Sequence, residues 1–174
     1  MKHCNWVYSM LNNEKEVELR VVEHQDFYMQ KDFKFNEGDL TTLYCLAVPK
    51  QRDLRSVRDL TADHLPLLKA IRDECLAAIE KTFNVPSAKI MSYFHYQPTF
   101  YHLHAHFVHV ERTMRDTREN VSLDSVIANI EMVPDFYQRT TLTYKVGTQM
   151  PLFKVLVDHG VLQPEPEESS ISTE

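Results

Sequence analysis

Glycine is scarce in this chain of 174 residues, where only Gly38, Gly147 and Gly160 occur. None of the three lies in a glycine-rich loop of the kind whose backbone amides hold phosphate, so a P-loop and a dinucleotide-binding turn are excluded. Any phosphate that this protein binds must therefore be held by side chains. Besides the histidines, the candidates for that task are the basic residues Lys34, Lys50, Arg52, Arg55 and Arg58.

Cysteine and long apolar runs are also rare. The three cysteines, Cys4, Cys45 and Cys75, have no C-x-x-C spacing, which indicates neither a disulfide framework nor a thiolate zinc site. No apolar run approaches the roughly 20 residues that cross a bilayer. Residues 1–6 lack the apolar stretch of a signal peptide. We therefore expect reduced cysteines that serve packing, no membrane partner, and a place in the cytoplasm or the nucleus.

The chain also has no excess of positive charge, since its net charge is −6. The last twelve residues, 163–174, hold four glutamates and no Lys or Arg. Without them the count is 19 basic against 21 acidic residues, a net charge of −2. Tracking along a long polyanion needs a basic face, so long nucleic acid is not expected as a partner. Residues 163–174 are expected to form a disordered acidic tail.

The remaining residues, 1–162, are enough for one domain with a sizeable core. Apolar spacing and turn residues predict helices over 5–16, over about twenty residues starting near Thr61 or Asp63, over 122–132 and over 152–159. Alternating or extended segments are predicted at 17–23, 27–29, 32–36, 42–48, 89–97, 102–110 and 140–146. Strands and helices in separate groups with hairpin connections indicate an α+β fold, an antiparallel sheet with flanking helices.

The long predicted helix has an apolar stripe and Pro66 in its first turn, where proline is tolerated. Packing on the sheet and contact with a second subunit are both compatible with that stripe. Its members are Leu65, Leu68, Ile71, Cys75, Ala78 and Ile79.

The most informative stretch is 102–110, which reads His-Leu-His-Ala-His-Phe-Val-His-Val. In a strand, side chains alternate between faces, so three imidazoles would share one face and the apolar residues between them would face the core. Same-face neighbours are roughly 7 Å apart, a spacing that suits a phosphate. Two histidines two apart can instead share a zinc ion, and a solvated strand face is the third interpretation. The predicted row is His102, His104 and His106, and the predicted core residues are Leu103, Ala105 and Phe107.

This pattern, with Phe107 and Val108 after the third histidine, resembles the signature of the histidine-triad superfamily of nucleotide hydrolases and transferases. The segments 6–8, 32–34, 55–60, 64–68 and 93–101, together with Glu16, are similar in order and spacing to one branch, the scavenger mRNA decapping enzymes. The resemblance covers nearly the whole chain, from Trp6 to Leu156. It implies a histidine-triad-like fold with a linker helix at its N-terminus. It also implies hydrolysis of the triphosphate bridge of residual mRNA cap to 7-methylguanosine monophosphate and a nucleoside diphosphate, without metal or other cofactor.

The resemblance also implies roles for single residues. His104 would be the catalytic nucleophile that forms a phosphohistidine. A cationic methylated guanine favours an aromatic face and a carboxylate partner. The implied phosphate-binding residues are His95, Thr99, His102, His106 and Lys34, and the implied cap-base residues are Trp6, Glu16, Asp32 and Phe33. The substrate would be a cap dinucleotide or a short capped oligonucleotide.

Two departures from the family pattern are visible. Family members carry a further N-terminal domain that closes over the cap, whereas this sequence begins just before the linker helix, so we expect that lid to be absent. Where the family has Ser-Tyr-Tyr, this chain has Thr99-Phe100-Tyr101 and lacks one hydroxyl near the phosphates. Because superfamily members commonly pair, a homodimer is expected.

Three other functions stay open at this point. The protein could hydrolyse diadenosine polyphosphates or adenylated amines, as other members of the superfamily do. It could bind cap without cleaving it, or it could be a zinc protein.

Overall fold

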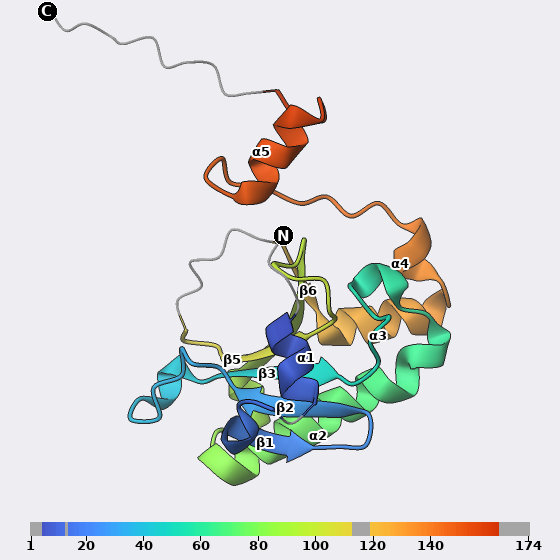
Figure 1. The fold of residues 1–174 in the computed structure, drawn as a ribbon. Helices are drawn as coiled ribbons and strands as arrows, with labels where there is room; N and C mark the ends of the chain where they lie inside the picture. Colours follow the sequence, from blue (N-terminus) through green and yellow to red (C-terminus); the bar gives the residue numbers. More distant parts are fainter. Residues whose placement is uncertain (1–4, 13, 113–118, 164–174) are drawn as a thin grey trace, which may run out of the picture.

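The computed structural model describes residues 5–12, 14–112 and 119–163, and its centre is one six-stranded sheet (Figure 1). All strand pairs are antiparallel, and the strand order is β1-β2-β3-β5-β4-β6. The strands are β1 (Arg20–Glu23), β2 (Phe27–Lys31), β3 (Tyr44–Pro49), β4 (Ile90–Tyr96), β5 (Ala105–His109) and β6 (Glu119–Ser122). The α+β fold with an antiparallel sheet, predicted from the sequence, is confirmed.

Helices flank this sheet and extend from one end of it. The α-helices are α1 (Asn5–Leu11), α2 (Leu65–Phe83), α3 (Leu123–Met132), α4 (Phe136–Arg139) and α5 (Pro151–Asp158). Short 3₁₀ turns are η1 (Val17–Leu19), η2 (Leu40–Thr42), η3 (Val57–Asp59), η4 (Ala62–His64) and η5 (Ser87–Lys89). In the described part of the chain, no helix is both long and apolar enough to span a bilayer.

The larger core lies between one face of the sheet and helices α2 and α3. Along β3 and β5, every second residue enters it, so strand alternation decides which side chains are buried there. Predicted core residues Leu103, Ala105 and Phe107 are all in this cluster. The stripe of α2 packs into the same core through Leu68, Ile71, Cys75 and Ile79. That stripe is therefore covered by the chain's own sheet.

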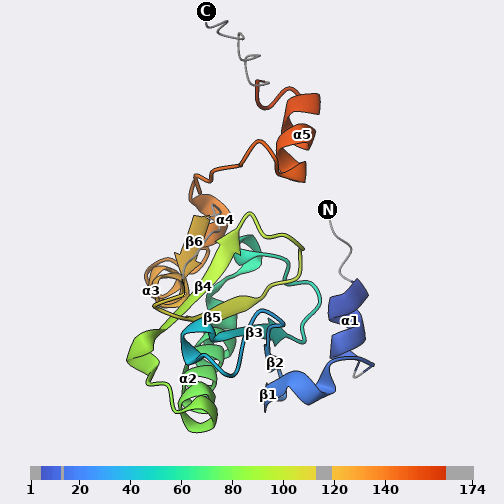
Figure 2. The same ribbon diagram turned by 90° about the vertical axis from the view of Figure 1, so that its left-hand side faces the viewer.

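The other face of the sheet is covered in part by α1 (Figure 2). Val7 and Met10 of α1 are fully buried in a second cluster with apolar residues of β3, β4 and β5. Arg20 donates a hydrogen bond to the carbonyl oxygen of Met10 at 2.9 Å, and Arg52 donates to Oδ1 of Asn12 at 2.7 Å. These contacts hold the N-terminal helix on the sheet face opposite α2.

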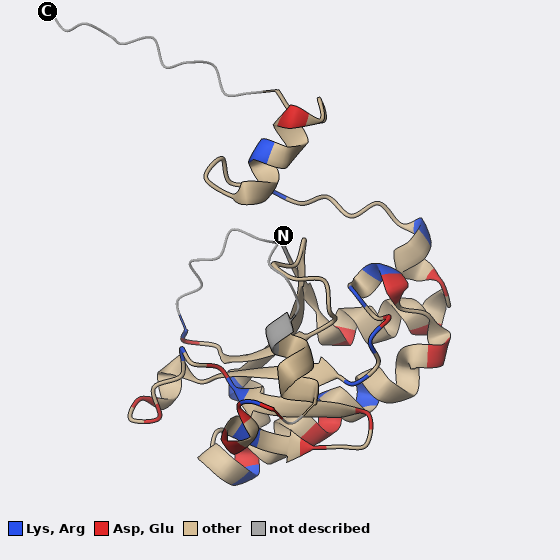
Figure 3. Ribbon diagram, in the orientation of Figure 1, with Lys and Arg blue, Asp and Glu red and all other residues tan. Residues whose placement is uncertain are grey.

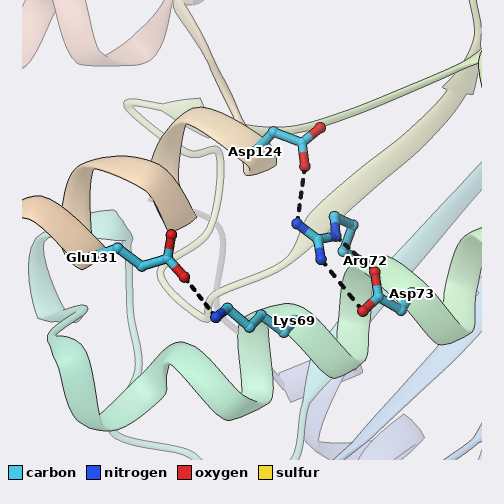
Figure 4. Close-up of polar contacts among 5 residues, drawn as sticks. All are labelled: Lys69, Arg72, Asp73, Asp124 and Glu131. Carbon is cyan, nitrogen blue, oxygen red and sulfur yellow. Dashed lines mark hydrogen bonds and ion pairs between the residues drawn. The ribbon is translucent and has the colours of Figure 1, made fainter.

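Charged side chains join α2 to α3 at the surface. Lys69 lies 2.6 Å from Glu131, and Arg72 lies 3.4 Å from Asp124 (Figure 4). Both pairs are solvent-exposed, so each contributes at most about 1 kcal/mol to stability. Basic and acidic residues are interspersed along these helices, as Figure 3 shows.

Several predicted boundaries were wrong. Residues 32–36 and 140–146 are not strands, since neither segment pairs with the sheet. The strand predicted over 102–110 starts only at Ala105, because the chain reaches the sheet there and pairs with both β3 and β4. Strand β6, which pairs with β4, was not predicted. The predicted acidic tail lies outside the described residues apart from Gln163.

The last helix, α5, lies apart from the body of the domain at the end of an extended segment (Figure 1). Gly160 follows it at φ +69, the left-handed region that glycine adopts without a steric penalty. The predicted end of this helix at Gly160 is confirmed within two residues.

Candidate active site

A cavity of about 480 Å³ opens on the α1 side of the sheet. His106 of β5 points to it because its neighbours Ala105 and Phe107 point to the α2 core. His104, just before the strand, lines the same cavity. Two of the three predicted imidazoles are thus brought together in one concave site.

His104 is oriented by the backbone. Its Nδ1 lies 2.7 Å from the carbonyl oxygen of His102, an acceptor, so Nδ1 carries the proton and donates. In that tautomer Nε2 has the lone pair that a nucleophile needs. The ring of Phe100 stacks on the imidazole, with centroids 4.1 Å apart and an interplanar angle of 13°. The side chain is 5% exposed, so both contacts hold a nearly buried ring in one orientation.

His106 is held from two sides. The hydroxyl of Tyr44 lies 2.7 Å from its Nδ1, and the ring of Tyr93 stacks on it at 5.1 Å. Tyr44 belongs to β3 and Tyr93 to β4, the two neighbours of β5 in the sheet. Sheet pairing therefore brings both aromatic partners to His106. Tyr93 lies directly opposite it in the register.

His95 of β4 adds a third imidazole from the neighbouring strand. Its ring centroid lies 4.2 Å from that of His106. Its Nδ1 lies 2.7 Å from Oδ1 of Asn120, the residue opposite it on β6. Because an amide oxygen only accepts, Nδ1 of His95 carries the proton. Sequence reasoning missed Asn120, since a single Asn within a four-residue strand has no distinctive pattern.

His102 lies elsewhere. It is fully buried, its Nε2 donates to the carbonyl oxygen of Pro49 at 2.8 Å, and its ring meets Tyr8 edge-on. Burial lowers the pKa of this imidazole below its usual value, and the charge of Arg52 acts in the same direction. His102 is not among the residues that line the cavity. This geometry indicates that His102 links the segment before β5 to the end of β3.

Four other predicted residues, Glu16, Asp32, Phe33 and Lys34, also line the cavity, as does Thr99, the residue before Phe100. Burial raises the pKa of Asp32 above its usual value, although the backbone N–H of Lys34 donates to its Oδ1 at 2.9 Å. Phe33 is 87% exposed, an unusual setting for a large aromatic side chain.

Neighbouring side chains contact Glu16 and Lys34 where they line the cavity. Glu16 accepts a hydrogen bond from Gln30 at 2.7 Å, and the Lys34 ammonium lies 5.2 Å from the ring centroid of Tyr44. Trp6 belongs to α1, but its side chain lies outside the described part of the structure, so its stacking role stays a prediction.

The basic loop, residues 50–58, carries four Lys or Arg side chains. Three of these cations are engaged in structural contacts. The Lys50 ammonium lies over the ring of Tyr28 at 4.3 Å. Arg52 contacts α1. Arg58 donates to the Tyr96 hydroxyl and to two backbone carbonyl oxygens near the end of α4. These three side chains therefore hold the fold together around the site.

The zinc interpretation has no geometric support in the described ranges. There, no group of three His, Cys, Asp or Glu side chains is arranged so that it could hold a metal ion.

Comparison with known proteins adds independent findings. A family model described as "Scavenger mRNA decapping enzyme C-term binding" matches residues 5–121. An m7GpppX diphosphatase of Ascaris suum is 42% identical over 155 residues, which are 86% of this chain and 52% of the relative. The m7GpppX diphosphatase of Homo sapiens is 36% identical over 157 residues, 87% of this chain and 47% of the relative. The chain thus spans about half the length of these curated relatives.

Among solved structures, a Hit-like protein from Bartonella henselae aligns with a TM-score of 0.47 and 21% identity. The alignment covers 74% of this chain and 98% of that one.

Proposed function

This chain belongs to the scavenger mRNA decapping enzyme family, and on that premise we propose that it hydrolyses the triphosphate bridge of residual mRNA cap. The products would be 7-methylguanosine monophosphate and a nucleoside diphosphate. The observation that carries the proposal is the orientation of His104, whose Nδ1–H is committed to a backbone carbonyl oxygen while its ring lines the cavity. The substrate would be a cap dinucleotide or a short capped oligonucleotide.

The proposed reaction has two displacements at one phosphorus atom. In the first, Nε2 of His104 attacks the phosphate that carries 7-methylguanosine, a nitrogen–phosphorus bond forms, and the bond to the bridging oxygen breaks. The nucleoside diphosphate departs with that oxygen and its electron pair. In the second, water attacks the phosphorus, an oxygen–phosphorus bond forms and the nitrogen–phosphorus bond to His104 breaks. This step releases 7-methylguanosine monophosphate, restores the His104 imidazole and gives one proton to the medium. Positioning and charge neutralisation dominate such transfers.

The imidazoles of His95 and His106, with Lys34 and Thr99, would hold the phosphates during this reaction. His106 and His95 approach each other closely, and their ring orientations are set by Tyr44 and Asn120. Lys34 brings a full positive charge to the same cavity. Since orientation of reactants lowers the barrier without a further chemical step, these contacts favour the first displacement.

Glu16, Asp32 and Phe33 would recognise the methylated base. Methylation makes guanine cationic, and its N1 and N2 hydrogens need acceptors, which the Glu16 and Asp32 carboxylates provide. The exposed ring of Phe33 offers a face for stacking, worth about 0.5 to 2 kcal/mol against a cation.

The ionisation of Asp32 leads to a pH-dependent prediction. Burial raises the pKa of this carboxyl, so acidification protonates it earlier than an exposed aspartate. The protonated group loses its charge and one acceptor, and affinity for 7-methylguanosine monophosphate is expected to fall as the pH is lowered from 7 towards about 4. Asp32→Asn should bind weakly and without this pH dependence, whereas exposed Asp63→Asn should behave like the wild type. Calorimetric titration on samples that circular dichroism shows to be folded measures both, and an unchanged affinity of Asp32→Asn would contradict the assignment.

A second prediction concerns Trp6. Trp6→Ala is expected to weaken binding of the methylated cap dinucleotide more than that of its unmethylated counterpart, because only the methylated base is a cation. A selectivity loss of roughly 2- to 30-fold corresponds to 0.5 to 2 kcal/mol. Competition binding with the two dinucleotides measures it, and equal losses for both would remove the assigned role.

The direct test is product analysis by chromatography. The purified chain is incubated with 7-methylguanosine linked to guanosine by a triphosphate, and with diadenosine triphosphate as a competing substrate. Cleavage of the methylated cap to 7-methylguanosine monophosphate and guanosine diphosphate would support the proposal. Preferred cleavage of the adenosine substrate would indicate another nucleotide hydrolase, and an intact but bound cap would indicate a binding module.

A further inference from the structure

A second, smaller hollow meets the main cavity at His104. Its lining includes Arg55 and Ser56 from the loop before η3, His95 of β4, and Pro98. Among the described residues, His104 is the only one that it shares with the main cavity. Its volume is about 10 Å³, which is room for a single oxygen-sized group. A phosphate would therefore lie at the mouth of this hollow with at most one oxygen inside it.

Arg55 differs from the other cations of its loop. In the part of the chain that the structure describes, its guanidinium takes part in no hydrogen bond, ion pair or ring contact, whereas Lys50, Arg52 and Arg58 all have such partners. The side chain is exposed at the rim of the hollow. Arg55 is thus the member of this loop whose charge is available to a ligand.

The backbone that carries Arg55 is firmly held. The N–H groups of Arg55 and Ser56 both donate to Oδ2 of Asp59, at 2.8 and 2.9 Å, and Ser56 completes a capping box with Asp59. The residue after Ser56, Val57, is fully buried in the main core. A flexible side chain on a fixed backbone can reach an anion at the hollow without a loop rearrangement.

The main cavity and the smaller hollow, which meet at His104, are lined by side chains of different chemistry. The main cavity has the carboxylates, the exposed aromatic ring and Lys34, which suit a cationic base and the first phosphate. The smaller hollow has a guanidinium and a hydroxyl, which can donate hydrogen bonds to phosphate oxygens, next to the His95 imidazole, and no carboxylate is among its described lining residues. A phosphate chain whose first phosphorus lies at His104 would continue towards the smaller hollow.

We infer that Arg55 binds the leaving nucleoside diphosphate, an inference that rests on the proposed function. When the bond to the bridging oxygen breaks, the departing diphosphate gains negative charge, and a guanidinium can pair with two of its oxygens at once. Arg55 would therefore stabilise the departing group more strongly than the bound substrate and would act on the first displacement.

The test compares two leaving groups on the same methylated nucleotide. One substrate is the methylated cap dinucleotide, which releases guanosine diphosphate, and the other is the p-nitrophenyl ester of 7-methylguanosine monophosphate, whose leaving group has no phosphate. Arg55→Ala is expected to lower kcat/KM for the dinucleotide by roughly 10- to 150-fold, the range for hydrogen bonds to charged groups. For the aryl ester, kcat/KM should change by less than about 3-fold, and Arg55→Lys should restore part of the loss on the dinucleotide.

Arg139→Ala is the matched control, because Arg139 is an exposed arginine of α4 that pairs with Asp135 and lines neither hollow. It should leave both substrates unchanged. Equal losses of Arg55→Ala on both substrates, or no loss on the dinucleotide, would overturn the inference.

A binding measurement separates this inference from the proposed function. If the wild-type chain cleaves neither substrate, the proposed function fails, but calorimetry with guanosine diphosphate still tests Arg55. Affinity for guanosine diphosphate should fall at least tenfold in Arg55→Ala and stay unchanged in Arg139→Ala. Equal affinity of wild type and Arg55→Ala would overturn the inference whatever the activity.

Discussion

Replacement of His104 by alanine is expected to abolish cap hydrolysis, with kcat lowered by at least about 10⁴-fold, while cap binding stays measurable. Loss of a covalent nucleophile removes the reaction path itself, which is why such substitutions have the largest effects on enzymes. Binding should persist because the residues proposed to recognise the base, Glu16, Asp32 and Phe33, do not include His104. Single-turnover product analysis and equilibrium binding of the cap dinucleotide measure the two effects.

The control for this experiment is a buried histidine of β5, the strand that begins directly after His104. His109 is 4% exposed, and its Nδ1 accepts the backbone N–H of Glu111 at 3.2 Å. It does not line the cavity. His109→Ala should therefore lower stability but leave kcat within a few-fold of the wild type. Retained turnover in His104→Ala would contradict the covalent mechanism.

Phe107→Ala is expected to destabilise the domain by about 3 to 5 kcal/mol. The Phe107 ring is fully buried between β5 and helix α2, and its removal leaves a cavity in the middle of the main core. Since domains of this size are stable by about 5 to 15 kcal/mol, the variant would lose a large share of its folding free energy. Because Phe107 lies directly behind the face that presents His106, activity should fall with the folded fraction.

Urea unfolding followed by circular dichroism measures this change in the free energy of unfolding. Val110 follows the same strand and is 46% exposed, so Val110→Ala should change stability by no more than about 0.5 kcal/mol. A loss below about 1 kcal/mol in Phe107→Ala would mean that the core repacks around the missing ring.

Much of the site was predictable from local patterns. Alternation along a strand requires residues 105 and 107 to face away from residue 106, so the core and the histidine face follow from a few neighbouring residues. The same local rule assigned the stripe of α2, whose members Leu68, Ile71, Cys75 and Ile79 are buried. The prediction that three imidazoles share one face was wrong for His102. It assumed that the strand continued back to His102, where the chain is not paired with the sheet.

Other features of the site could not be predicted from the sequence. In the sequence, Arg52, Arg55 and Arg58 are equivalent members of one basic loop. Only the folded surroundings show that Arg52 and Arg58 make structural contacts, whereas Arg55 faces the hollow next to His104. Likewise, nothing near residue 120 indicates a contact with His95, because β6 is short and becomes a strand only by pairing with β4.

The sequence by itself determined the fold class, the family and the face on which His104 and His106 lie, since all of these depend on residue types and spacing along a short stretch. Tertiary structure alone decided which partners hold His95, His102 and His106. His95 and Asn120 are 25 residues apart, and His102 and Pro49 are 53 apart. Such contacts depend on strand order and register, which arise from packing of the whole sheet on its helices and are not encoded in any local pattern.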